Sequence, residues 1–483
     1  MFSGRITNLK NKRDVSGLLN LYAQNADNVN VIHLANIYGI LAKEVRGFNN
    51  VEKLKTDERF KGLLESTIDK LQSTPEWFDV RGIATITHSL GKLKIFDEGF
   101  FNEIVRLRER IAKEGEPQTL SNIVWAFATV GCESAELFEA VAAQHGRIAR
   151  EGKVQELSNS CWAFAKAGHR ADALFEAVAG QHKLIAERGN AQELSNSCWA
   201  FAKAGHRADA LFEEVVGQHK RIVASDKVQA MITNCWAFAT VGHEAEALFK
   251  AVAAQHGRFV GNGNEQEVTT TLWSFAIAGY LDEGSGLVKK LWKMACDGRL
   301  QLNKEGLLQL ALFYAAAQIE GPKLDLEPLP ESLLSQIEAA AAQLEDIVSL
   351  NHKEVSDTLK ELEIYHEIEV SPFESSNVTF NTSTMLNIDI VISKKENKKV
   401  AIEFNGPKHY VQCNGLDVES GRTKFKRRLL EKLNFTVVSI HWDDWRKARE
   451  ANTRQVFLLA QIPNWSWSLK GFQASSFFGK VKE

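Results

Sequence analysis

A tryptophan recurs every 37 residues through the middle of this chain, and the residues around it recur as well. Each copy reads WAFA or WSFA and reaches a glycine six residues after the tryptophan, at Trp125, Trp162, Trp199, Trp236 and Trp273. The copies that begin at Gln155 and Gln192 are identical at 28 of 37 positions. A fixed period of this length is typical of a stacked array of one supersecondary unit. Because such arrays present long continuous surfaces, the repeat favours a binding protein.

Each copy predicts two helices joined by a short turn. In the second copy, Leu157, Cys161 and Phe164 follow the i, i+4, i+7 spacing of a helix face, and Gly168 stands where the helix should end. A second helical pattern follows over residues 171–189. The predicted fold is therefore an α-solenoid of αα-hairpins. The same pattern extends to three outlying segments, which indicates about seven or eight units: 34–44, 81–93 and 301–318.

Comparison of the copies separates positions that repeat from positions that vary. Tryptophan, phenylalanine and glycine recur because the same packing problem recurs at every junction, so we interpret the tryptophan column as core. Two columns vary, and in helical repeats that read one base each, two or three side chains per unit contact the base. The candidate RNA-reading residues in these columns are Ser160, Ser197, Asn234 and Thr271, and Lys166, Lys203 and Thr240. The alternative is unselected variation of a surface.

Basic residues also recur near the end of each copy. Arg147, Lys183, Arg221 and Arg258 stand beside a histidine in successive copies. Stacking would align them into a stripe for a phosphate backbone. The alternative is that they suit the negative end of a helix dipole. The histidines lie one per repeat, too far apart to share a metal ion, so no metal is predicted there.

The charge distribution, the cysteines and the apolar runs of the chain indicate the kind of partner and compartment to expect. The net charge is −3, but residues 390–483 hold 18 Lys and Arg against 9 Asp and Glu, so a basic C-terminal part follows an acidic array. None of the six cysteines forms a CxxC pair, which favours free thiols in a reducing compartment. No apolar run reaches the length of a bilayer crossing, and no membrane is expected. Residues 1–13 are basic and acid-free, as at the edge of an organellar transit segment or in an ordinary N-terminus.

The pattern changes after prolines at 322, 328 and 330 end the array. A helical stretch is expected over 331–364, then short β-rich runs at 386–393 and 399–406. The segment GRTKFKRRLLEKLNF predicts an amphipathic basic helix, and TVVSIHWDDW predicts another strand. The expected unit is α/β. Tryptophans at 442, 445, 465 and 467 interleave with basic residues there, and they could stack on unpaired bases or form core.

These last residues carry a resemblance. VAIEFNGPKHY followed by GRTKFKRRLLEKLNFTVVSIHWDDW resembles the RAP domain over about residues 399–458. The repeats resemble the octotricopeptide and heptatricopeptide class, and the tandem is similar to the Fas-activated serine/threonine kinase-like family of organellar RNA proteins. The resemblance implies single-stranded organellar mRNA or rRNA as partner and a role in RNA processing, transcript stability or rRNA maturation. It implies mitochondria, or alternatively chloroplasts, and a recruited nuclease or ribosomal proteins as further partners.

The predicted organisation follows from the repeat and the resemblance. The expected regions are a divergent N-terminal helical region at 1–80, the repeat array at 81–320, a helical connector at 321–378 and a RAP-type α/β domain at 379–470. Within the last domain, the expected RNA contacts are Lys408, His409, Lys424, Lys426, Arg427 and Arg428.

The RAP domain is in turn similar to the restriction-endonuclease-like fold, which implies a possible nuclease site at Asp389, Glu403 and Asn405. Two facing carboxylates could hold Mg²⁺ for phosphodiester hydrolysis, and no cofactor is expected otherwise. Asn405 stands where that fold has a lysine, and Lys408, Lys424 or Lys426 could replace it from elsewhere in space. Three functions therefore stay open: an RNA-binding protein, a metal-dependent endoribonuclease, and a protein-binding scaffold.

Overall fold

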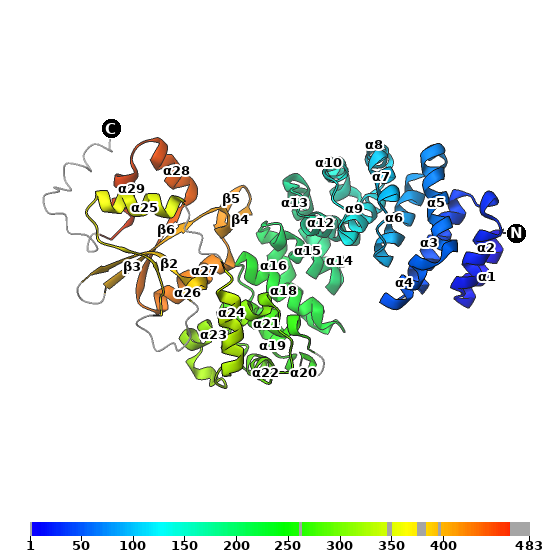
Figure 1. Cartoon of the computed structure of the whole chain (residues 1–483). Helices are drawn as coiled ribbons and strands as arrows, with labels where there is room; N and C mark the ends of the chain where they lie inside the picture. The colour runs from blue at the N-terminus through cyan, green and yellow to red at the C-terminus, as the bar shows by residue number, and fades with distance from the viewer. Residues whose placement is uncertain (1, 260–262, 345–349, 374–382, 395–397, 464–483) are drawn as a thin grey trace. The chain divides into compact units, whose positions relative to one another are not determined.

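The computed structural model describes the chain apart from residues 1, 260–262, 345–349, 374–382, 395–397 and 464–483. It divides into two compact units, residues 1–225 and 226–483. The first unit is built from helices, and the second combines helices with a C-terminal sheet (Figure 1). This confirms the predicted fold class, a helical repeat array followed by a small α/β region.

The first helix of each repeat forms the framework of the array. In the first unit these helices are α3 (Val31–Glu44), α6 (Val80–Leu93), α9 (Pro117–Val130), α12 (Val154–Ala167) and α15 (Ala191–Lys203). In the second unit they are α18 (Val228–Val241), α21 (Glu265–Ala278) and α23 (Lys304–Glu320). Successive members within a unit pack side by side (Figure 1). Because α3, α6 and α23 occupy the three outlying segments, the array does extend beyond the five tryptophan copies.

In the five repeats that begin with α6, α9, α12, α15 and α18, the second helical stretch is broken by a turn, where the sequence had predicted one continuous helix. The resulting pairs are α7 (Glu98–Arg106) and α8 (Arg108–Glu114), α10 (Ala135–Ala142) and α11 (His145–Glu151), α13 (Asp172–Ala179) and α14 (His182–Arg188), α16 (Asp209–Gly217) and α17 (His219–Ala224), and α19 (Glu246–Ala253) and α20 (His256–Phe259). At Gln181, φ is −95° and ψ is 20°, outside the helical region. The turn lets both halves bury apolar residues, such as Val178 and Ile185, against the first helices.

Two repeating residues explain why the same unit recurs. The glycine that ends the first helix has positive φ, 72° at Gly168 and 74° at Gly131, a conformation that favours glycine. The phenylalanine after the tryptophan packs against the preceding repeat, since the rings of Phe164 and Phe138 meet edge to face at 5.0 Å. Phe201 and Phe175 repeat this contact at the same distance. Turn chemistry and ring packing together therefore specify the repeat.

The C-terminal sheet has the order β1-β2-β3-β6. Its strands are β1 (Glu367–Val370), β2 (Ile388–Lys394), β3 (Lys398–Asn405) and β6 (Phe435–His441). β1–β2 and β2–β3 are antiparallel, whereas β3–β6 is parallel. Three predicted strands are thus present, and β1 adds a strand within the region expected to be a helical connector. A separate hairpin of β4 (Tyr410–Cys413) and β5 (Leu416–Glu419) was not predicted.

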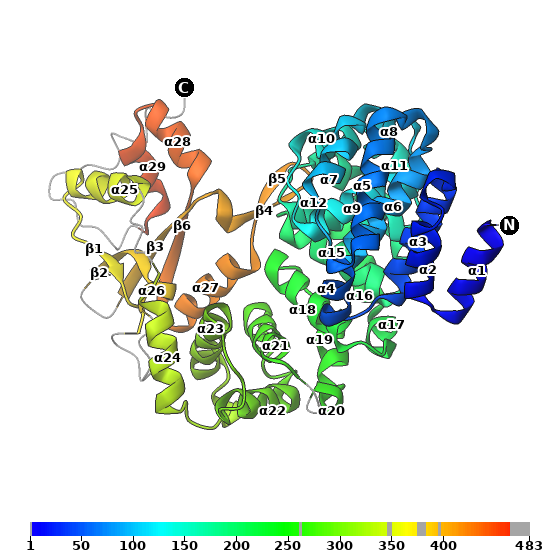
Figure 2. The ribbon, with the colours of Figure 1, turned by 45° about the vertical axis from the view of Figure 1, so that its right-hand side comes forward.

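Helices cover both faces of this sheet (Figure 2). One face packs on α25 (Leu350–Glu361), α28 (Trp442–Glu450) and α29 (Arg454–Gln461), and the other packs on α27 (Gly421–Lys432). Trp445 is buried among these helices and its indole Nε1 donates to Glu354 at 3.2 Å, so this tryptophan is core. The tryptophans at 465 and 467 lie outside the described residues.

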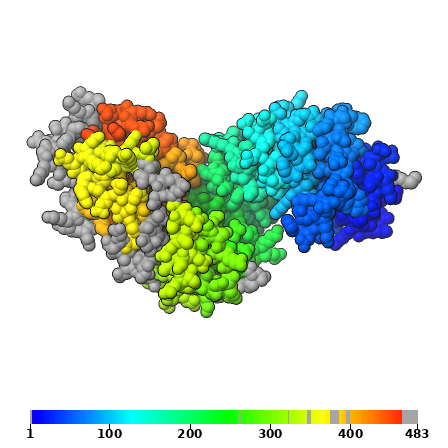
Figure 3. All heavy atoms as spheres, viewed as in Figure 1, coloured from blue at the N-terminus to red at the C-terminus, as the bar shows by residue number. Residues whose placement is uncertain are grey.

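The remaining helices complete the two units. They are α1 (Phe2–Lys12), α2 (Val15–Ala23), α4 (Phe48–Thr56), α5 (Glu58–Ser73), α22 (Ser285–Cys296), α24 (Glu331–Ala341) and α26 (Ser383–Leu386). Within the first unit, side chains of successive repeats form a continuous surface on the face seen in Figure 3. None of the described helices combines the length and apolarity that a bilayer crossing requires.

Candidate functional site

Two carboxylates lie side by side on neighbouring strands of the sheet. The register of β2 and β3 pairs Ile390 with Ile402, which places Asp389 opposite Glu403. Asp389 Oδ2 accepts a hydrogen bond from the backbone N–H of Phe404 at 2.7 Å. Glu403 is only 5% exposed. The structure therefore brings together the two acids that the sequence had paired.

A lysine from α27 completes this arrangement. The ammonium of Lys426 pairs with Glu403 Oε2 and donates to the carbonyl of Asn387 at 2.6 Å. Burial raises the pKa of Glu403 to about 7, although the charge of Lys426 opposes the rise. The pKa of Lys426 is also raised, because the attraction of Glu403 and Asp389 outweighs burial. Among the three lysines considered as replacements for the missing one, Lys426 is the one in contact with Glu403.

A histidine joins the cluster from the opposite side. His352 Nε2 lies 3.2 Å from Asp389 Oδ2, and its Nδ1 lies 3.5 Å from Glu369. Burial disfavours the charged imidazolium, but the two carboxylates raise the pKa of His352 overall. Ligand atoms of His352, Glu369 and Asp389 fall within 4.8 Å of one another, close enough for one cation to contact all three. The sequence did not single out His352 or Glu369, because only the folded sheet brings them to Asp389.

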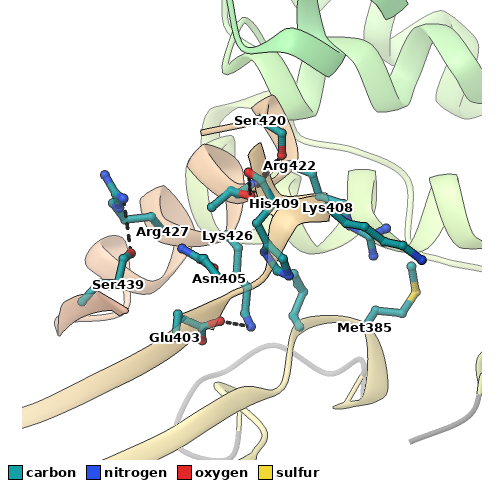
Figure 4. Close-up of a pocket in the computed structure, with 13 residues that line it drawn as sticks. Met385, Glu403, Asn405, Lys408, His409, Ser420, Arg422, Lys426, Arg427 and Ser439 are labelled. Carbon is teal, nitrogen blue, oxygen red and sulfur yellow. Dashed lines mark hydrogen bonds and ion pairs between the residues drawn. The ribbon is translucent and has the colours of Figure 1, made fainter. Parts of the chain in front are cut away.

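A cavity of about 310 Å³ opens beside Glu403 (Figure 4). Its floor includes the buried amide of Asn405, and its rim carries the exposed side chains of Lys408 and Arg422. Burial and the nearby Lys426 lower the pKa of His409, so this half-buried ring is neutral near pH 7. The volume is at the lower end of the range for small-ligand sites. Cations at the rim and a neutral ring inside suit a nucleotide, whose phosphate is anionic and whose base is flat.

Four basic side chains of α27 bind other parts of the protein: Lys424, Lys426, Arg427 and Arg428. Lys424 Nζ donates to the carbonyl of Gly242 at 2.7 Å, at the C-terminal end of α18. Arg428 donates to the carbonyl of Ala276 at 2.7 Å and to Glu320 at 2.6 Å. These contacts satisfy carbonyls that helix ends leave unpaired and oppose the negative end of the helix dipole.

Arg427 of the same helix pairs with Glu419 and lies 3.3 Å from the hydroxyl of Ser439. Together with the bonds of Lys424, Lys426 and Arg428, this corrects the expectation that these four side chains of α27 are free to contact RNA. The helix docks on repeat ends and on the sheet, and a sequence that shows only its charge could not reveal this. Of the predicted RNA contacts in this region, Lys408, His409, Lys426 and Arg427 line the cavity, and Lys408 is exposed at its rim.

The first variable column of the repeats is buried. Ser160, Ser197, Asn234 and Thr271 are each at most 1% exposed. The Asn234 amide donates to the carbonyl of Ala230 at 2.8 Å, four residues earlier in its helix. The expectation that this column faces a ligand is therefore corrected. Its variation reflects small side chains that fit a tight space and bond their own helix where they can.

The second variable column and the tryptophans lie toward solvent. Lys166 and Lys203 are exposed in the last turns of α12 and α15, whereas Thr240 of α18 is half-buried. Each of the five repeating tryptophans is half-buried, not enclosed. This corrects the interpretation of the tryptophan column as core, because the phenylalanine two residues later takes the enclosed position.

Two of the recurring basic residues near the ends of the copies, Arg147 and Arg221, cap the preceding repeat. Arg221 donates to the carbonyls of Ala186 and Gly189 at 2.8 and 2.7 Å, and Arg147 donates to the carbonyl of Lys113 at 2.9 Å. The dipole interpretation is therefore correct for both arginines. These side chains are structural links between repeats.

The fold and the site define a class: helical-repeat proteins that end in a small α/β domain with a charged cavity. Two family models match this chain. The RAP domain model matches residues 402–460. The model described as RNA-editing substrate-binding complex 6 protein matches residues 52–326, more than half of the chain. The chain belongs to the RNA-editing substrate-binding complex 6 protein family. No curated protein matches the sequence significantly.

Proposed function

We propose that this protein is an RNA-binding component of a mitochondrial RNA-editing substrate-binding complex, whose proteins are its partners. The repeat array holds single-stranded RNA, at roughly one nucleotide per repeat by analogy with other base-reading helical repeats. The RAP domain holds one nucleotide or one end of the same RNA in the cavity beside Glu403. A role in transcript processing or stability follows from holding the substrate of such a complex.

The observation that carries this proposal is the position of the family match. The matched residues 52–326 include the helical array from α5 to α23, and the RAP match begins within β3, the strand that holds Glu403. Both matched regions also carry accessible cations, Lys166 and Lys203 on the array and Lys408 at the cavity. Such cations suit a phosphate backbone.

A salt-dependent binding measurement tests the proposal. The full chain should bind an unstructured RNA oligonucleotide, and its affinity should fall linearly on logarithmic axes as salt rises. The double variant Lys166→Glu with Lys203→Glu should bind more weakly and reduce the salt slope by about 0.7 for each phosphate that is no longer neutralised. Lys53→Glu, an exposed lysine of α4, is the matched control. If the full chain binds no RNA even at low salt, the proposal fails.

Its mitochondrial location needs a separate test. The endogenous protein should co-fractionate with mitochondrial RNA-protein complexes and leave them after RNase treatment. Recovery only in another compartment would contradict the assignment.

One observation favours a second candidate function, a metal-dependent endoribonuclease. Lys426 supplies from α27 the lysine that the strand motif lacks, beside Glu403 and Asp389. Mg²⁺ would have to bind Asp389 and the Glu403 oxygen that Lys426 leaves free. RNA cleavage that requires Mg²⁺ and is lost in both Glu403→Gln and Asp389→Asn would support this candidate. Cleavage that persists in these variants would assign it to a contaminant.

A further inference from the structure

The solvent side of α6, α9, α12 and α15 carries the same four positions in each repeat. In α12 these are Gln155, Asn159, Trp162 and Lys166, spaced i, i+4, i+7 and i+11. At 100° per residue, this spacing places them on one narrow stripe of the helix. Gln155 and Lys166 are exposed, and Asn159 and Trp162 are half-buried. We call the stripes of these four helices the ladder face.

Aromatic rings run continuously across the ladder face. The rings of Trp125 and Trp162 lie 6.3 Å apart between centroids with planes 30° apart, and those of Trp162 and Trp199 lie 6.1 Å apart at 34°. His88 takes the tryptophan position in α6, and its ring lies 4.9 Å from Trp125. Burial lowers the pKa of His88 to about 4, so this ring is neutral near pH 7. Four uncharged rings therefore contact one another in sequence.

The polar positions of the ladder face are amides, hydroxyls and cations. The full set is Arg81, Thr85, His88 and Lys92 in α6, Gln118, Asn122, Trp125 and Thr129 in α9, Gln155, Asn159, Trp162 and Lys166 in α12, and Gln192, Asn196, Trp199 and Lys203 in α15. The set holds four cationic side chains and no carboxylate, although the chain as a whole is acidic. The charge of this face is thus complementary to a polyanion.

Core packing alone does not require tryptophan at this position. Phe164 and Phe201, two residues after Trp162 and Trp199, are each 1% exposed, and their rings pack edge to face on the preceding repeat. The tryptophans instead keep part of the indole at the surface in every copy. A ring that is fixed on one side and accessible on the other is suited to stacking with a flat ligand.

We propose that the ladder face of the first unit is a stacking platform for the unpaired bases of single-stranded RNA. Bases stack on the accessible parts of the indoles, the Asn and Gln amides hydrogen-bond base edges, and the lysines contact phosphates. This inference rests on the proposed RNA-binding function and names the surface that performs it. Duplex RNA is excluded from such contacts, because its bases are already stacked and paired.

The first experiment needs no mutation. The full chain is titrated with a labelled RNA oligonucleotide of about 10 nucleotides, an abasic RNA with the same backbone, and a duplex of the same length. Stacking of one base on an aromatic side chain changes affinity by about 5- to 150-fold. The abasic RNA and the duplex should therefore bind at least about 10-fold more weakly than the single strand. Equal binding of intact and abasic RNA would refute the proposal that bases stack on the ladder face. It would still be compatible with RNA binding through phosphates.

The second experiment locates the platform. Trp162→Leu and Trp199→Leu keep an apolar side chain against the neighbouring helices but remove the ring, and each should weaken binding of the intact RNA by about 5-fold or more. Trp162→Phe should recover most of the affinity. The control is Trp77→Leu, which removes a tryptophan that is 67% exposed and lies off the ladder face. Unchanged affinity in the folded leucine variants, judged by thermal melting, would overturn the proposal, as would absence of any RNA binding by the full chain.

Discussion

Substitution of Gly421 by alanine should break the docking of α27 on the repeat helices. Gly421 is the first residue of α27, and a Cβ at this position would lie 1.6 Å from the carbonyl oxygen of Ala239 and 2.8 Å from its carbon. Both are backbone atoms at the end of α18, so no side-chain rotation can relieve the overlap. Gly421 does not need a left-handed backbone, because its φ is not positive. Alanine therefore tests the close approach alone.

The magnitude follows from the interactions that must be given up. Overpacking a close contact costs about 1–3 kcal/mol. Relief requires α27 to move away from α18, which lengthens the 2.7 Å bond from Lys424 to Gly242. A hydrogen bond to a charged group contributes about 1.5–3 kcal/mol, so the loss should total about 2.5–6 kcal/mol. For a unit of this size, each kcal/mol lowers the melting temperature by about 2–4 °C.

Calorimetry of the full chain measures this effect on the transition that includes the second unit. We expect the melting temperature of this transition in Gly421→Ala to fall by at least about 5 °C, with faster hydrogen exchange in α27 and at the end of α18. Gly406→Ala is the control, because a Cβ there meets nothing within 4 Å and φ is −71°. A Gly421→Ala melting temperature within about 1 °C of the parent would refute the close-approach argument.

Three further predictions address the site and the repeat. The pKa of Glu403 is raised to about 7 in the folded state, so this carboxyl stabilises the fold fully below its unfolded pKa and loses that contribution as pH rises through about 7. The melting temperature should therefore fall over this pH range. Glu403→Gln should make the melting temperature less dependent on pH. If the melting temperature of Glu403→Gln falls with pH as steeply as that of the parent, Glu403 is not the cause of the fall. Arg221→Met should destabilise by about 1–2 kcal/mol in denaturant unfolding, whereas Lys220→Met, its exposed neighbour, should change little. Gly168→Ala should lower the free energy of unfolding by about 1–2 kcal/mol, because φ at this residue is 72°. The control is Gly146→Ala at an exposed position of α11, which should stabilise the protein slightly. Equal effects of the two substitutions would refute the role of the left-handed cap.

The repeat made the array predictable in detail. Its first helices, their glycine ends and the outlying copies all follow from local patterns, since helix periodicity and turn chemistry act within about 15 residues. The break in the second helix was missed although Gly180 stands beside Gln181, because a single glycine within a helical pattern is tolerated and no proline marks the turn. The strand β1 was missed because it pairs with β2, about 20 residues further along the chain.

The candidate site was only partly predictable. Asp389 and Glu403 were named because the RAP domain is similar to the restriction-endonuclease-like fold, and Lys426 was one of three lysines considered there. The roles of Lys424 and Arg428 were not predictable, because their partners Gly242 and Glu320 lie more than 100 residues away in sequence.

The sequence by itself determined the architecture: the length of the repeat, the class of each element and the RAP resemblance all come from local spacing and residue type. Tertiary structure alone decided which side of each helix faces solvent and which charges are already paired. It buried the variable column of Ser160 and exposed part of Trp162, the reverse of what repetition suggested. The physical reason is that a residue recurs wherever its surroundings recur. In a regular array, a half-exposed ring has the same surroundings in every repeat, just as a buried ring does. Only the packed neighbours distinguish the two.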